Sequence, residues 1–113
     1  MKIIKKSITV DELDIFAKQR FGNMVKAVVD VEKELMAIDG ELHADEEALL
    51  LEKGSRQEDL WGVNLYPELK GADFIEFDSM INVRPSVKNM TRGINDSKIR
   101  KRIINIVKKL VKK

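Results

Sequence analysis

The sequence predicts a single α+β domain over residues 1–113, in which an antiparallel sheet of four to five strands carries three helices packed on one face. Two observations lead to this fold class. Strand-like alternation and helical periodicity follow one another in the order β-α-β-β-α-β-β-α, and the consecutive strand pairs favour antiparallel pairing. A length of 113 residues with 43% hydrophobic residues is enough for one modest core, and the absence of cysteine excludes disulfides.

In the first half of the chain, short strands alternate with two helices. Lys2 to Lys6 predicts an edge strand, and a capping box formed by Thr9 and Glu12 opens a helix that runs to about Arg20. Two strands then form a hairpin, and a helix with acids in its first turn follows, where the helix dipole favours negative charge. These three elements are expected at residues 24–32, 35–39 and 44–53.

The second half of the chain contains two strands and the longest helix. The first strand is expected at residues 61–66, and Asn95 or Asp96 caps the last helix, which runs to about Val111. Residues 112–113 are expected to form a disordered basic tail. The apolar residues of the helix recur at helical spacing and predict its buried stripe: Ile99, Ile103, Ile106, Val107 and Leu110.

The longest predicted strand covers Phe74 to Pro85, and its two faces differ. One face is apolar apart from Ser79, whereas polar side chains alternate along most of the other face. Paired with the preceding strand, this second face would gather Asn64, Tyr66, Glu76, Asp78, Asn82 and Arg84. Arg84 suits a carboxylate or phosphate, which Asn64 and Asn82 would orient. Alternatively, the face is solvated and Arg84 forms a cross-strand ion pair with Glu76 or Asp78.

The loop from Ser86 to Gly93 leads into the start of the last helix and carries Asn89 and Arg92. A helix N-terminus beside basic and hydroxyl side chains is an arrangement that binds anions. The glycine spacing of a phosphate loop is absent. The sequence therefore indicates an anion site that includes Arg84, Asn89 and Arg92, without a motif that identifies the ligand.

The only histidine, His43, lies among acids and is the candidate for acid–base chemistry. Imidazole titrates near neutral pH, so His43 with Asp45 or Asp78 would serve as the general base of a small hydrolase. Alternatively, His43 lies at the entrance of the second helix and hydrogen-bonds a backbone group. A zinc pair on a helix needs a second histidine, and the sequence predicts neither a metal site nor a cofactor.

The net charge of +2 hides a division within the chain. Residues 84–113 contain eleven lysines and arginines against one acid, Asp96, whereas residues 1–83 contain ten basic and eighteen acidic residues. Such asymmetry predicts partners rather than fold. The basic residues of the last helix and tail are Lys98, Arg100, Lys101, Arg102, Lys108, Lys109, Lys112 and Lys113.

This basic helix has two interpretations. It would contact nucleic-acid phosphates, although no aromatic residue lies beyond Phe77 to stack on bases. Alternatively, its lysines complement the helix dipole, and the helix packs against the acidic middle of its own chain or of a second subunit.

Three stretches carry a family resemblance: Gly40–Asp45, Trp61–Pro67 and Ser79–Pro85. On these the sequence resembles a family of small uncharacterised proteins of archaea and bacteria, classed as a domain of unknown function. The resemblance covers nearly the whole chain. It implies an α+β fold and a cytoplasmic protein, and it implies no activity.

Together these features favour a non-enzymatic binding module for an anionic ligand or nucleic acid, contacted through the basic last third of the chain. The alternatives are the small hydrolase and a homo-oligomeric interaction protein, such as a homodimer joined by complementary charge or an exposed strand edge. No transmembrane segment or signal peptide is predicted, so we expect a cytoplasmic protein without a membrane partner.

Overall fold

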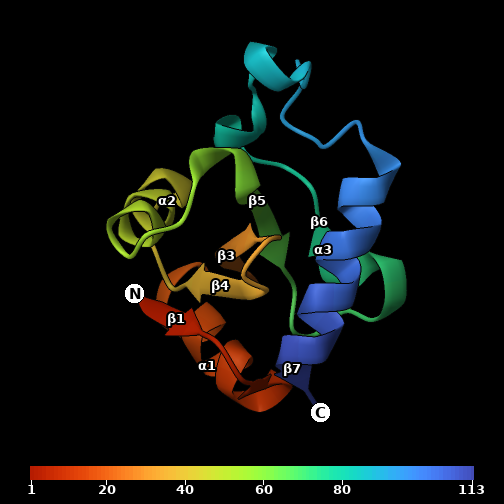
Figure 1. Ribbon diagram of the computed structural model, residues 1–113. Helices are drawn as coiled ribbons and strands as arrows, with labels where there is room; N and C mark the ends of the chain where they lie inside the picture. Colours follow the sequence, from red (N-terminus) through yellow and green to blue (C-terminus); the bar gives the residue numbers. More distant parts are fainter.

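Five strands form one antiparallel sheet in the order β1-β4-β3-β5-β6, and three helices surround it (Figure 1). The computed structural model describes all 113 residues. The helices are α1 (Val10–Arg20), α2 (His43–Glu52) and α3 (Ser97–Leu110). The strands of the sheet are β1 (Lys2–Ile4), β3 (Val25–Asp30), β4 (Leu35–Ile38), β5 (Leu60–Leu65) and β6 (Ile75–Glu76). The α+β class with an antiparallel sheet is therefore confirmed.

Local capping signals fix the starts of two helices. The Thr9 Oγ1 accepts a hydrogen bond from the Glu12 N–H at 3.0 Å, and the Glu12 carboxylate accepts one from the Thr9 N–H at 3.1 Å. The Asp96 carboxylate caps α3 by accepting from the Lys98 N–H at 2.8 Å. Both caps satisfy backbone donors that the first helical turn leaves without partners.

The predicted hairpin between the second and third strands of the chain is present as β3 and β4. Its turn is held by the buried Asp30, whose Oδ1 accepts from the N–H groups of Glu32 and Lys33 at 2.9 and 2.8 Å. The other carboxylate oxygen accepts from the Ser55 hydroxyl at 2.6 Å. One buried acid therefore joins this turn to the segment that follows α2.

The helices lie on both faces of the sheet, which corrects the expectation that all three pack on one face. The main core lies under α1 and α3 and includes alternate residues of β3 and β5, such as Val29 and Val63. A smaller core on the other face joins Val28 and Leu60 to Leu50 of α2. The central strands are buried on both faces, so they need a cover on each side. Each fully buried aliphatic side chain contributes about 1.5–3 kcal/mol.

The predicted long strand from Phe74 to Pro85 is wrong beyond its first residues. Only Ile75 and Glu76 pair with β5, opposite Leu65 and Asn64. The chain then turns through two short 3-10 helices, Met80–Asn82 and Pro85–Val87, and protrudes at the top of the view in Figure 1. The Ser79 hydroxyl starts the first of them by accepting from the Ile81 N–H at 3.3 Å, which ends the extended conformation.

A segment just before α1 and a segment just after α3 form a second, two-stranded sheet. Strand β2 (Ile8–Thr9) pairs in parallel with β7 (Val111–Lys112), so Lys112 belongs to the fold rather than to the disordered tail expected at 112–113. None of the helices combines the length and the apolar character that a membrane crossing requires.

Candidate functional site

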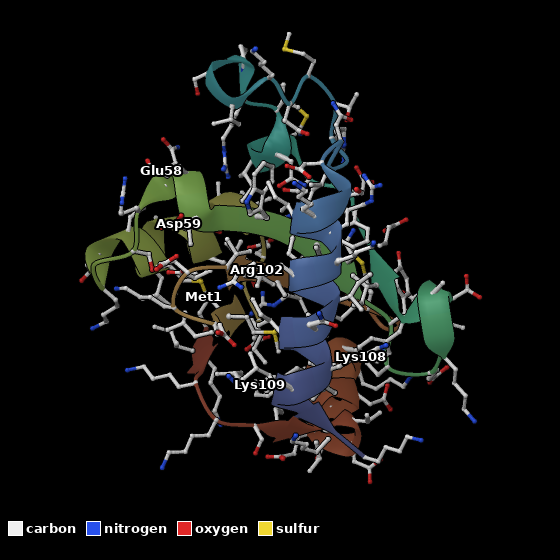
Figure 2. The ribbon with its side chains drawn as sticks, turned by 45° about the vertical axis from the view of Figure 1, so that its right-hand side comes forward. Met1, Glu58, Asp59, Arg102, Lys108 and Lys109 are labelled. Atoms are coloured by element: carbon white, nitrogen blue, oxygen red, sulfur yellow. The ribbon has the colours of Figure 1, made fainter.

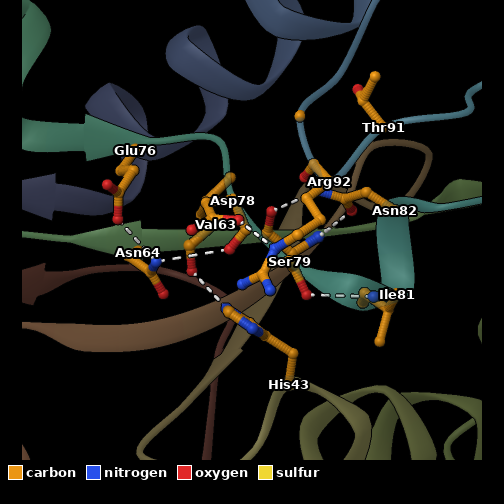
Figure 3. A network of polar contacts seen from close by, with 12 residues as sticks. His43, Val63, Asn64, Glu76, Asp78, Ser79, Ile81, Asn82, Thr91 and Arg92 are labelled. Atoms are coloured by element: carbon orange, nitrogen blue, oxygen red, sulfur yellow. Dashed lines mark hydrogen bonds and ion pairs between the residues drawn. The ribbon is translucent and has the colours of Figure 1, made fainter.

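A polar cluster lies at the edge of the sheet, where β5 meets β6 (Figure 3). The Asn64 Nδ2 donates to a Glu76 carboxylate oxygen at 2.9 Å, and the Tyr66 hydroxyl donates to the same oxygen at 2.8 Å. The hydrogen bond to Glu76 raises the pKa of Tyr66. The register of β5 and β6 thus brings together three residues that the sequence placed side by side.

The ion pairs in this region differ from those expected. Asp78 pairs with Arg92, with 2.6 Å between the carboxylate Oδ1 and the Arg92 Nε, and both side chains are exposed. Arg84 pairs with neither Glu76 nor Asp78, because it lies on the far side of the turn that interrupts the predicted strand.

Asn82 is fully buried and supports the sheet from the side. Its Oδ1 accepts from the Gly62 N–H at 2.8 Å, and its Nδ2 donates to the Gly62 and Arg92 carbonyl oxygens at 2.9 and 3.0 Å. These bonds satisfy the Gly62 backbone, where β6 no longer runs beside β5. The hydrogen-bonding groups of Asn82 are therefore all engaged by the chain itself.

Asn89 organises the loop that protrudes before α3. Its Nδ2 donates to the carbonyl oxygens of Asn82, Thr91 and Gly93 at 2.7, 3.1 and 2.8 Å. Its Oδ1 accepts from the Asn95 N–H at 2.8 Å. The Asn95 N–H lies near the helix start, where the sequence predicted an anion site. In the structure this N–H already donates to the buried Asn89.

Arg84 is 9% exposed, and its guanidinium also binds groups of the protein itself. Its Nε donates to the Ile81 carbonyl oxygen at 3.0 Å, its Nη2 donates to the Leu60 carbonyl oxygen, and its guanidinium lies 4.6 Å from the centre of the Trp61 ring. The Glu47 carboxylate lies 3.8 Å from Nη2. Burial lowers the pKa of Arg84. Its contact with the Trp61 ring and its two hydrogen bonds to backbone carbonyl oxygens connect the loop to β5.

His43 is the first residue of α2 and is 8% exposed. Its Nε2 lies 2.8 Å from the Val63 carbonyl oxygen, which only accepts, so the hydrogen bond assigns the proton to Nε2. Burial lowers the pKa of His43, which keeps the ring neutral at pH 7. Asp45 is exposed on α2 and Asp78 pairs with Arg92, and neither carboxylate hydrogen-bonds His43. The structure thus shows the hydrogen bond from His43 to a backbone group, which was the alternative interpretation of this residue. No acid is hydrogen-bonded to His43.

Glu46 is a buried acid that the sequence analysis missed. Its Oε2 accepts from the Gly40 N–H at 2.8 Å, and the side chain is fully buried. Burial raises the pKa of Glu46 to about 9, despite the opposing effect of the Gly40 hydrogen bond. The acid is therefore neutral at pH 7. No group of three or more histidine, aspartate or glutamate side chains is arranged to hold a metal ion.

Basic side chains cover the solvent face of α3, which contains no acid. Residues three, four and seven positions apart share a face of a helix. Two adjacent rows run along this face: Lys98, Arg102, Asn105 and Lys109, and Lys101, Asn105 and Lys108. At about 1.5 Å per residue, the 14 residues of α3 extend the face over about 21 Å.

One side of this face contacts the turn between β3 and β4. Lys109 Nζ lies 2.9 Å from a Glu34 carboxylate oxygen, and Arg102 Nη2 lies 4.0 Å from the other. The Arg102 Nε also donates to the Val31 carbonyl oxygen at 2.7 Å. The hydrogen bond from Lys109 lowers the pKa of Glu34. Lys109 and Arg102 therefore contact Glu34, an acid in the acidic middle of the same chain, as one interpretation of the basic helix expected.

The remaining lysines are exposed and form no salt bridge: Lys98, Lys101, Lys108, Lys112 and Lys113. We call these five residues the lysine face. Figure 2 shows Lys108 on the side of α3 opposite to Arg102 and Lys109. Lys108 therefore lies on the side away from Glu34, and none of the five lysines is paired with an acid of the protein.

A family model described as "Protein of unknown function (DUF5674)" matches residues 2–110. The chain belongs to this family. No curated protein and no solved structure matches the chain. Family membership brings no activity with it, so the function is inferred from the side chains themselves.

A groove between α3 and the segment from Pro67 to Phe77 was not predicted. The sequence contained a signal for it, because Leu69, Phe74 and Ile104 fall outside the predicted buried stripes of the strands and the last helix. Leu69 is 47% exposed, and the other two are half-buried.

Proposed function

We propose that this protein is a non-enzymatic module that binds duplex nucleic acid without reading its sequence. The lysine face is the observation that supports the proposal, since five exposed lysines on α3, on β7 and at the last residue have no acidic partner. Proteins that bind nucleic-acid backbones gain affinity by placing lysine and arginine against phosphates and releasing counterions.

The dimensions of α3 suit a duplex backbone. Double-stranded DNA carries one negative charge per about 1.7 Å of its axis, so a basic helix about 21 Å long passes several phosphates. Flexible lysines reach phosphates as point charges and do not require a fixed base edge. We therefore expect contacts to the backbone, with little preference for sequence.

The absence of aromatic side chains from α3 favours a duplex over a single strand. Single-strand binders combine a basic groove with aromatic rings on which bases stack. No residue of α3 or β7 is aromatic, and the last aromatic residue of the chain, Phe77, is half-buried in the groove beside α3. A cytoplasmic setting, where nucleic acid is accessible, is part of the proposal and agrees with the lack of cysteine.

The proposal is tested by fluorescence anisotropy with a labelled 20-base-pair DNA of mixed sequence at 50 mM salt. The double variant Lys98→Gln/Lys101→Gln removes two charges from the lysine face. The control Lys2→Gln/Lys53→Gln removes two charges from exposed lysines on β1 and at the end of α2, and α2 packs on the opposite face of the sheet. Both double variants have the same net charge.

We expect micromolar binding by the wild type, a loss of about tenfold or more in the α3 variant, and a much smaller loss in the control. A competing duplex of unrelated sequence should displace the labelled one equally well. Equal losses in the two variants would place the contact elsewhere, and the absence of binding at 50 mM salt would refute the proposal.

A further inference from the structure

The groove beside α3 is a hollow of about 870 Å³ whose apolar lining the nucleic-acid proposal does not use, although Lys108 and Lys113 of the lysine face lie at it. Its walls come from α3, from β7, from the first residues of α1, and from the segment between Pro67 and Phe77. We call it the α3 groove. A volume in this range is typical of pockets that bind small molecules.

Apolar side chains form most of the lining. The largest of them are Leu69, Phe74, Ile75, Phe77, Ile104 and Val107. Leu69 is 47% exposed, and Phe74, Ile75 and Phe77 are only half-buried, so apolar surface remains open to water in the free protein. Covering this surface with an apolar ligand group is favourable by about 25 cal/mol per Å² removed from water.

The charged groups of the α3 groove are mostly positive. Lys70, Lys108 and Lys113 lie along it, and Asp11 is the one acid of its lining. All four are exposed, and none forms a salt bridge. Figure 2 shows Lys108 on the side of α3 that faces the segment between β5 and β6. A ligand that places its apolar part in the groove therefore meets ammonium groups where it reaches solvent.

We infer that the α3 groove binds a free single-chain amphiphile with a linear apolar tail and a carboxylate head, such as a fatty acid. The tail lies against the apolar lining, and the carboxylate interacts with Lys70, Lys108 and Lys113. The charge of these lysines disfavours a cationic amphiphile of the same length, whose head they would repel.

An apolar tail fits this lining better than a peptide does. The backbone of a bound peptide would bury N–H and C=O groups that need hydrogen-bond partners. Among the side chains of the groove, only the three lysines and Asp11 carry polar groups. A hydrocarbon tail has no such groups to satisfy.

The test uses dansylamino-undecanoic acid, a fluorescent fatty acid whose emission rises and shifts to the blue in an apolar site. We expect saturable binding with one probe per chain. Dodecanoate should displace the probe, whereas dodecyltrimethylammonium should do so at least about tenfold less well.

Two substitutions address the groove without touching the lysine face. Ile104→Gln places a polar group in the lining and should weaken probe binding about tenfold or more, and Ala72→Trp should block the groove from its exposed rim. Ile15→Gln is the matched control, because Ile15 is an exposed isoleucine of α1 outside the lining. It should leave the affinity unchanged, and circular dichroism confirms that each variant is folded.

Three results would overturn the inference. The first is an absence of probe binding by folded wild-type protein, and the second is equal displacement by the anionic and cationic amphiphiles. The third is a dimer in sedimentation that Ile104→Gln dissociates, since the groove would then be occupied by a second copy of the chain. Because Lys98 and Lys101 lie outside the groove, the double variant Lys98→Gln/Lys101→Gln should retain probe binding, so this inference and the nucleic-acid proposal fail independently.

Discussion

Replacing Asn82 by alanine should destabilise the protein more than most single substitutions do. The side chain is fully buried, and three hydrogen bonds of 2.8–3.0 Å join it to the backbone of Gly62 and Arg92. Alanine removes all three bonds and leaves a buried N–H and a buried C=O of Gly62 without partners. Each unsatisfied buried group costs about 1–3 kcal/mol, so we expect a loss of about 3–5 kcal/mol in the free energy of unfolding.

The assay is equilibrium unfolding in guanidinium chloride, followed by far-UV circular dichroism. A loss of this size lowers the melting temperature by about 15–30 °C in a domain of about 100 residues. The slope of the free energy against denaturant should stay unchanged, because the surface exposed on unfolding is nearly the same.

The matched control is Asn105→Ala on the solvent face of α3. Asn105 is exposed and makes no side-chain hydrogen bond, and alanine favours a helix by a few tenths of a kcal/mol. The control should therefore stay within about 0.7 kcal/mol of the wild type. An Asn82→Ala protein that is less than about 1 kcal/mol weaker than the wild type would refute the structural role given to this side chain.

Two further predictions concern buried groups on the face of the sheet that α2 covers. Burial raises the pKa of Glu46 to about 9, so the folded state keeps a proton that the unfolded state loses above about pH 4.5. The free energy of unfolding should therefore fall by up to about 1.4 kcal/mol per pH unit between pH 4.5 and 9. Glu46→Gln keeps an acceptor for the Gly40 N–H and should flatten that decline in pH-dependent unfolding; an unchanged profile would contradict the assignment. Gly62→Ala should cost about 1–3 kcal/mol in thermal unfolding, because a methyl group there would lie 2.6 Å from the Ser79 Oγ. Gly93→Ala, whose methyl group meets its nearest atom at 3.5 Å, is its control, and equal losses in both would exclude the steric reason.

Features that depend on neighbouring residues were predicted well from the sequence. The capping box of Thr9 and Glu12 and the β3–β4 hairpin are encoded within a few positions, and both are present. The meeting of Asn64 and Glu76 follows from one cross-strand pair, which requires only the correct register of β5 and β6.

Features that depend on distant backbone were not predicted. The placement of α2 requires strands that are buried on both faces, and the consecutive apolar residues Ala27, Val28 and Val29 were the signal for this. The alternation after Glu76 resembled a strand, whereas Asn82 is fixed by hydrogen bonds to Gly62, 20 positions away. No local pattern distinguishes an asparagine that binds a ligand from one that braces a loop.

The division of the basic residues of α3 depends on the same kind of distant contact. Periodicity predicts which residues face solvent, but the ion pairs of Arg102 and Lys109 require the position of Glu34, about 70 residues earlier in the chain. The exposed lysines that remain are the basis of the proposed function.

The measurement that tests this function most directly is the salt dependence of duplex DNA binding by the wild type and the Lys98→Gln/Lys101→Gln variant. If three to five lysines contact phosphates, log K should fall linearly with log salt, with a slope of about −3 to −5. The variant should reduce the magnitude of this slope by about 2, one for each lost contact. Equal slopes in the two proteins, or an affinity that does not change with salt, would contradict a phosphate contact through the lysine face.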